Sequence, residues 1–131
     1  MTNDLRVLVV DDHPVNRLVL GEIFTLLGCN VSTAEDGISA LAAASVDTFD
    51  LICLDRHMPG LSGDDVVSGL PGDQFVLAWS TDLSDLPRRF NGVLSKPVNL
   101  AAAESAITRA MAWRVAAALQ AALRPTPAAA A

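Results

Sequence analysis

The stretch LICLDRHMPG, residues 51–60, places four apolar residues directly before an aspartate, which is followed at once by a Pro-Gly break. A short apolar run bounded by turn residues is typical of a strand that is buried on both faces. Asp55 ends this run, and a carboxylate at the mouth of a buried strand is costly to remove from water without a partner. The stretch therefore predicts a buried strand whose carboxyl end meets a charged site.

Similar apolar runs recur along the chain and alternate with helical patterns. Strands are predicted at residues 5–10, 30–34, 49–54, 75–80 and 93–95, and helices at 14–28, 37–46, 62–70 and 99–123. Strands that alternate with helices indicate a parallel sheet with right-handed crossovers and helices on both faces. We therefore expect one doubly wound α/β domain over residues 1–123, followed by a disordered tail at 124–131.

Three of the predicted helices carry apolar stripes that we expect to face the core. The stripes consist of Val15, Leu18, Val19, Ile23, Leu26 and Leu27 in the first helix, Ile38, Leu41, Ala42 and Val46 in the second, and Leu100, Ala103, Ile107, Met111, Val115, Leu119 and Leu123 in the last.

The composition narrows the class of protein. With 131 residues, 51% of them hydrophobic, the chain is long enough for one globular core. Its net charge of -6 argues against binding to nucleic acid or to an anionic membrane, because either would repel it. Cys29 and Cys53 lie in apolar contexts typical of reduced core cysteines, and neither an export signal nor a convincing membrane span is evident. We therefore expect a cytoplasmic protein that interacts with proteins or cations.

Polar side chains stand at the carboxyl ends of four predicted strands. Asp11 and Asp12 follow the first strand, Asp55 the third, Ser80 the fourth and Lys96 the fifth. In doubly wound sheets these ends border the ligand crevice. Converging carboxylates either raise a pKa or recruit a cation, and oxygen ligands favour magnesium. A lysine and a hydroxyl beside them suit a phosphoryl group, so the set predicts a Mg2+ site that receives phosphate on a carboxylate.

Four stretches, taken in order, resemble receiver domains of bacterial two-component response regulators. They are VLVVDDHPVNR (7–17), LICLDRHMPGLSG (51–63), LAWST (77–81) and VLSKP (93–97). The resemblance covers residues 5–115 and implies a flavodoxin-like five-stranded sheet of order 2-1-3-4-5. The first stretch is most similar to receivers of hybrid histidine kinases. Because only one long helix and a tail follow the last stretch, we expect a stand-alone receiver.

The resemblance also implies roles for individual residues. Asp55 is the phosphoacceptor, Lys96 pairs with the phosphoryl group, and the hydroxyl of Ser80 binds that group in the switched state. Mg2+ is coordinated by Asp12, Asp55 and the backbone carbonyl of His57, while Asp11 acts mainly through a metal-bound water.

The resemblance further implies that His57, Thr81 and Asp82 flank the phosphoryl group and tune its reaction with water. The phosphodonor is a histidine kinase or a histidine phosphotransfer protein of a phosphorelay. The acyl phosphate on Asp55 then hydrolyses slowly in place, and the Lys96–Pro97 bond is cis.

Three features depart from the family pattern. Val93 stands where the family usually has a tyrosine or phenylalanine that swings inward on activation, and the chain contains no tyrosine. The third helix must be short, and Pro87 and Gly92 leave little more than a turn for the fourth. The final helix continues past its usual end, so a homodimer through this helix is one interpretation and packing on its own domain is the other.

Alternative functions follow from the same residues. A pseudo-receiver, an interaction module that works independently of phosphorylation, is favoured by Val93 and the shortened fourth helix and disfavoured by the complete acidic site. A phosphatase of the haloacid dehalogenase type requires Asp-x-Asp after the first strand, which is not found here. Among the remaining residues, we expect Arg56 to be solvated on its loop, and Trp79 and Trp113 to be packing residues.

Overall fold

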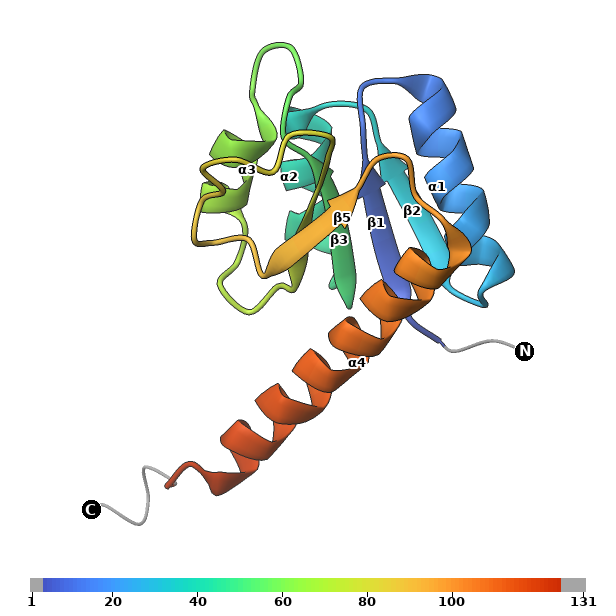
Figure 1. The fold of residues 1–131 in the computed structure, drawn as a ribbon. Helices are drawn as coiled ribbons and strands as arrows, with labels where there is room; N and C mark the ends of the chain where they lie inside the picture. The colour runs from blue at the N-terminus through green and yellow to red at the C-terminus, as the bar shows by residue number, and fades with distance from the viewer. Residues whose placement is uncertain (1–3, 126–131) are drawn as a thin grey trace.

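The computed structural model describes residues 4–125, which form five strands and four helices (Figure 1). In chain order these are β1 (Arg6–Val10), α1 (Pro14–Leu26), β2 (Asn30–Ala34), α2 (Gly37–Val46), β3 (Leu51–Asp55), α3 (Gly63–Gly69), β4 (Val76–Ser80), β5 (Gly92–Ser95) and α4 (Leu100–Leu123). Most of the predicted tail, residues 126–131, lies outside the described residues.

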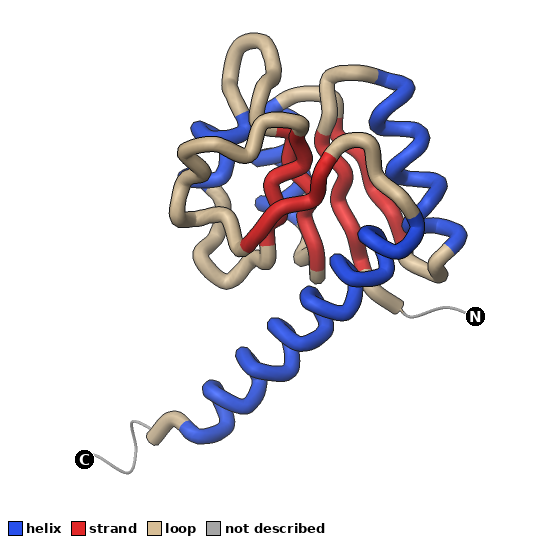
Figure 2. Tube along the Cα trace, viewed as in Figure 1, coloured by secondary structure: helices blue, strands red, loops and turns tan. Residues whose placement is uncertain are grey.

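The strands form one parallel sheet in the order β2-β1-β3-β4-β5, which confirms the predicted fold and strand order. The register places Asp55, the last residue of β3, beside Trp79 of β4, and Ser80 beside Ser95 of β5. Figure 2 shows the strands (red) side by side, and because all five are parallel, their carboxyl ends share one edge of the sheet.

Two hydrophobic clusters lie on opposite faces of the sheet, because successive residues of a strand point to opposite sides. Helices α1 and α4 cover the face that carries Val9, Cys53 and Leu77. Helices α2 and α3 cover the other face, which carries Leu8 and Leu54. The central strands are therefore buried on both sides, as their apolar sequences predict.

Three helices begin with side-chain caps, in which a carboxylate, hydroxyl or amide oxygen accepts from a backbone N–H of the first turn. Asp36 caps α2, Ser62 caps α3 and Asn99 caps α4. Helix α1 instead has Pro14 in its first turn, where the missing N–H costs nothing. Each helix thus starts at a residue suited to that position.

The predicted apolar stripes were largely wrong about which helix faces are buried. Helix α1 buries Leu20 and Phe24, helix α2 buries Ala40 and Ala44, and both leave most of their predicted stripes partly or fully exposed. Helix α4 packs through Ala103, Ala106, Ile107 and Ala110, while Leu100, Met111, Val115, Leu119 and Leu123 are exposed. Small side chains allow a helix to approach the sheet closely, so alanine positions form the contact. The second half of α4 projects beyond the sheet (Figure 1).

The segment between β4 and β5 contains no helix, although the structure describes all of residues 81–91. Helix α3 is also short, ending at Gly69. The fourth helix of the family pattern, which was predicted to be little more than a turn, is therefore replaced by turns and bends.

Within residues 4–125, no helix combines the length and the apolar character needed to cross a bilayer.

Candidate functional site

Three carboxylates meet at the carboxyl edge of the sheet. Asp11 and Asp12 follow β1, Asp55 ends β3, and one oxygen from each lies within 4.8 Å of the others. Asp11 is fully buried and Asp55 is 4% exposed, whereas Asp12 is open to solvent. Such an oxygen-only donor set, exposed on one side, fits a hard divalent cation that keeps part of its water shell, as Mg2+ does.

Lys96 extends from the end of β5 into this cluster. Its Nζ lies 2.8 Å from Asp11 Oδ2 and 3.4 Å from Asp55 Oδ2. The backbone N–H of Lys96 donates to the carbonyl of Ser80, and the following bond to Pro97 is cis, as the resemblance implied. One ammonium thus faces three carboxylates, and the excess negative charge favours a bound cation.

The two buried carboxyl groups respond differently to this environment. Burial raises the pKa of Asp55 to about 6; Lys96 opposes this rise and Asp11 adds to it. Burial alone would raise the pKa of Asp11 as well, but hydrogen bonds from Lys96 and from the His13 N–H outweigh it, so the pKa of Asp11 lies below its usual value. Asp11 is therefore held as a carboxylate, whereas Asp55 takes up a proton more readily than an ordinary carboxyl group when no cation is bound.

Trp79 takes part in this site. The sequence analysis predicted only a packing role for this residue. Its side chain is buried in the core, yet the indole N–H donates to Asp11 Oδ2 at 2.9 Å. Lys96 Nζ also lies 5.2 Å from the centre of the Trp79 ring. A buried indole usually requires an acceptor for its N–H, and this requirement was the available signal.

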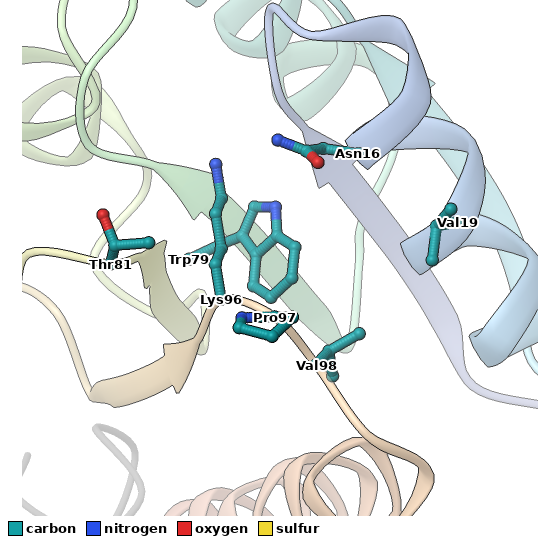
Figure 3. A pocket seen from close by; sticks show the side chains of 7 residues that line it. All are labelled: Asn16, Val19, Trp79, Thr81, Lys96, Pro97 and Val98. Atoms are coloured by element: carbon teal, nitrogen blue, oxygen red, sulfur yellow. The ribbon is translucent and has the colours of Figure 1, made fainter.

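A cavity of about 300 Å³ lies beside this group. Figure 3 shows the Lys96 side chain extended alongside the Trp79 ring, with Thr81 on one side and Asn16 on the other. Val19, Pro97 and Val98 supply its apolar walls. The predicted residue Thr81 therefore borders the space next to Lys96.

The remaining predicted residues lie where the β3–α3 loop meets the loop after β4. The backbone N–H of Asp82 donates to Ser80 Oγ at 3.0 Å, and His57 Nε2 lies 3.2 Å from Asp82 Oδ2. Hydrogen bonds from the hydroxyl and N–H of Ser84, together with His57, lower the pKa of Asp82 to about 2. The structure thus places His57 and Asp82 in contact, with Ser80 adjoining Asp82.

Arg56 is buried, so the expectation of a solvated loop arginine was wrong. Only 4% of the residue is exposed. Its Nε and Nη2 bind the carboxylate of Asp64, and its remaining donors reach backbone carbonyls of the loop after β4, those of Asp82, Ser84 and Asp85. The guanidinium therefore ties the loop after β3 to the loop after β4.

Gly63 is a second residue that sequence reasoning missed. A Cβ built on Gly63 would lie 1.9 Å from the backbone oxygen of Asp55, which no side chain allows. The Gly63 N–H donates to the carbonyl of Arg56 at 2.9 Å. The start of α3 is therefore packed directly against the strand end that carries Asp55, and only glycine fits there.

Comparison with known proteins agrees with this geometry. The family model described as "Response regulator receiver domain" matches residues 7–108. Over 59 residues, 45% of this chain, the sequence is 44% identical to the sensor protein EvgS of Escherichia coli K12. Over 61 residues, 47% of this chain, it is 41% identical to the sensor histidine kinase RcsC of Salmonella typhimurium. The matched regions span only 5% and 6% of those two proteins.

Solved structures with the same fold include two whole receiver-sized chains. The chemotaxis response regulator CheY4 of Vibrio cholerae superposes with a TM-score of 0.73 at 28% identity, covering 82% of this chain and 99% of that one. The response regulator TrrA of Thermotoga maritima, solved in complex with Mg(2+)-BeF, gives a TM-score of 0.76 at 29% identity, covering 84% of this chain and 99% of that one.

Proposed function

This chain belongs to the response regulator receiver family, whose members are phosphoacceptors of two-component signalling, and we propose that it accepts a phosphoryl group on Asp55 from a phospho-histidine of a phosphorelay. The observation that carries the proposal is the placement of Asp55, a buried carboxylate 3.4 Å from Lys96 Nζ and grouped with Asp11 and Asp12. The donor is a histidine kinase or a histidine phosphotransfer protein, and the reaction takes place in the cytoplasm.

Mg2+ would be held by the carboxylates of Asp12 and Asp55 and the backbone carbonyl of His57, with Asp11 behind them. When bound, Mg2+ neutralises negative charge on the carboxylates and on the phosphoryl oxygens. The donor set supports this assignment because it consists of oxygen atoms, carries excess negative charge and is open to solvent at Asp12.

In the transfer itself, a carboxylate oxygen of Asp55 bonds to phosphorus while the phosphorus–nitrogen bond of the phospho-histidine breaks. The imidazole leaves with the electron pair of that bond, and the product is an acyl phosphate. Lys96, now shared between Asp11 and Asp55, is within reach of the phosphoryl oxygens. Ser80, at the end of the neighbouring strand, supplies a hydroxyl to the same group.

The lifetime of the acyl phosphate would be set by the residues around it. His57, Thr81 and Asp82 lie on the two loops that border Asp55, where they limit how water approaches phosphorus. Hydrolysis is slow and the protein signals through contacts with other proteins. Because Val93 stands in place of the usual aromatic residue, the switch uses shifts of backbone or helices instead.

The decisive experiment incubates the chain with a small acyl-phosphate donor, with and without Mg2+, and measures its intact mass. We expect the chain to gain the mass of one phosphoryl group only with Mg2+. Asp55→Asn should gain no mass under either condition. Asp73→Asn, which changes an exposed aspartate outside the site, is the matched control and should behave like the unmodified chain. An unchanged mass under every condition would reject the proposal and favour the pseudo-receiver.

We also propose that the projecting half of α4 pairs with a second copy of this chain. Met111, Val115, Leu119 and Leu123 are exposed at four-residue intervals, and residues 115–123 include no charged side chain. Two copies can therefore approach along this face without charge repulsion. Sedimentation should show a dimer that Leu119→Glu converts to a monomer, whereas a monomeric unmodified chain would exclude this pairing.

A further inference from the structure

Trp79 contacts two of the charged groups in the site from within the core. The residue is 3% exposed, and its ring packs in the cluster between the sheet and helices α1 and α4. The indole N–H donates to Asp11 Oδ2 at 2.9 Å, and Lys96 Nζ lies 5.2 Å from the ring centre. A rigid side chain thus reaches both an acid and the ammonium that neutralises it.

The hydrogen bonds of Asp11 make the role of this indole specific. Asp11 Oδ1 accepts from the backbone N–H of His13, and Oδ2 accepts from both Lys96 Nζ and Trp79 Nε1. Asp11 is fully buried, so an oxygen that loses its donors has little water to replace them. In the proposed reaction, Lys96 turns toward the phosphoryl group on Asp55. Trp79 then remains as a fixed donor to Oδ2.

Resting on the proposed phosphoacceptor function, we propose that Trp79 is a positioning residue for the movement of Lys96. Its N–H keeps Asp11 paired while the ammonium transfers from Asp11 to the phosphoryl group. Its ring attracts the cation through a cation–π interaction and keeps it near the strand ends. The cavity beside Lys96 and Thr81 leaves space for this side chain to move (Figure 3).

Beryllofluoride with Mg2+ is a suitable probe, since the related TrrA was solved in complex with Mg(2+)-BeF. Trp79→Phe retains an aromatic ring, removes the N–H and leaves a smaller side chain in the core. Trp113→Phe is the matched control, because Trp113 packs on Phe75 with ring centres 5.6 Å apart and borders a different pocket, next to Phe49 and Asp50. Bound beryllofluoride is measured by fluorine NMR, and Mg2+ binding in its absence by calorimetry.

We expect Trp79→Phe to weaken beryllofluoride binding about tenfold, the loss of one hydrogen bond to a buried charged group. Binding of Mg2+ alone should change much less, because Lys96 still pairs with Asp11 in that state. A general structural defect would weaken both ligands equally, so the ratio of the two affinities separates positioning from stability. Trp113→Phe should leave both affinities unchanged. Equal beryllofluoride affinity in Trp79→Phe and the unmodified chain overturns the role of Trp79.

Fluorescence supplies a second test that does not require Trp79→Phe to fold. In Trp113→Phe, Trp79 is the sole tryptophan of the chain, and its emission should change when beryllofluoride binds and Lys96 changes its position over the ring, from Asp11 toward Asp55. Binding without any change in emission overturns the proposal. If the unmodified chain fails to bind beryllofluoride at all, the phosphoacceptor function falls first and the role of Trp79 falls with it.

Discussion

Two cations lie next to Asp55, the buried Arg56 and the partly buried Lys96, and their surroundings differ. Each of the five N–H donors of Arg56 has an acceptor, two of them on Asp64 and three on backbone carbonyls. Lys96 is divided between Asp11 at 2.8 Å and Asp55 at 3.4 Å, with the carboxylate of Asp12 close by. The arginine is fully satisfied by its own chain, whereas the lysine faces more negative charge than it can neutralise. The first arrangement fixes structure, and the second leaves a demand for a ligand.

This contrast explains how the loop after β4 remains ordered without a helix. In the absence of intrahelical hydrogen bonds, the carbonyls of residues 82, 84 and 85 need other donors, and Arg56 supplies them from the loop after β3. These contacts of Arg56, the Arg56 clamp, therefore join the carboxyl edge of the sheet to the segment that departs most from the family pattern. Replacing either Arg56 or Lys96 by an uncharged residue should show, from the loss of stability, which of the two is structural.

The largest effect is expected for Arg56→Met. Removing the guanidinium leaves Asp64 without its ionic partner and three carbonyls without donors, so the free energy of unfolding should fall by about 4 kcal/mol. Mg2+ should not restore it, because the clamp lies outside the acidic group. Urea unfolding with and without Mg2+ measures both effects. Arg88→Met, at an exposed position on the loop after β4, is the control and should change stability by less than about 0.5 kcal/mol.

The next effect concerns the pH dependence of stability. The pKa of Asp55 is raised from 3.8 to about 6 by burial, so between these values the folded protein binds more protons than the unfolded chain. As pH rises through this range, the free energy of unfolding should therefore fall, by at most about 3 kcal/mol. Bound Mg2+ favours the charged carboxylate and should reduce this fall.

The contribution of Asp55 is isolated by comparing the unmodified chain with Asp55→Asn between pH 4 and pH 7 in metal-free buffer. The variant lacks the titrating group, so its free energy of unfolding relative to that of the unmodified chain should be higher at pH 7 than at pH 4. Parallel stability profiles for the two chains would contradict the assigned environment of Asp55.

Lys96→Met should produce a smaller and metal-dependent loss. Asp11 loses its ionic partner, but Asp55 can take up a proton, which limits the cost to about 2 kcal/mol in metal-free buffer. Added Mg2+ should stabilise this variant more than the unmodified chain, since the metal replaces the missing positive charge. Lys96→Arg, which keeps the charge, is the control. A loss that Mg2+ leaves untouched would place Lys96 in the same class as Arg56.

The contrast between the two cations also shows what the sequence could predict. Buried parallel strands are apolar runs closed by polar residues, so the strand at residues 30–34 was predicted with the observed bounds, and Asp55 and Lys96 were predicted at strand ends. Parallel topology then brings those ends together. The burial of Arg56 had no such local signal, because its acceptors are mostly backbone carbonyls 26 to 29 residues further along the chain, which carry no side-chain signature.

The prediction of which helix faces are buried was wrong for a related reason. Counting large apolar side chains selected Ile38 and Val46 in α2, which are exposed, over Ala40 and Ala44, which are buried. Close approach of a helix to a sheet selects for small residues, and hydrophobicity alone does not reveal this. Trp79 was predicted to pack, but only the fold could identify Asp11 as the acceptor of its N–H.

The smallest effect on stability is expected for the contact between His57 and Asp82, which joins the loops after β3 and β4. His57 follows Arg56, its ring contacts Asp82 at 3.2 Å, and the two side chains are 62% and 47% exposed. An exposed pair of this kind contributes little, so His57→Ala should change the free energy of unfolding by less than about 0.5 kcal/mol. The same change should alter the lifetime of the acyl phosphate several-fold, because it opens the approach of water to Asp55. Intact mass followed over time after removal of the donor measures that lifetime, with Asp82→Asn testing the pair from its other side. A large loss of stability with an unchanged lifetime would instead make this contact an extension of the Arg56 clamp.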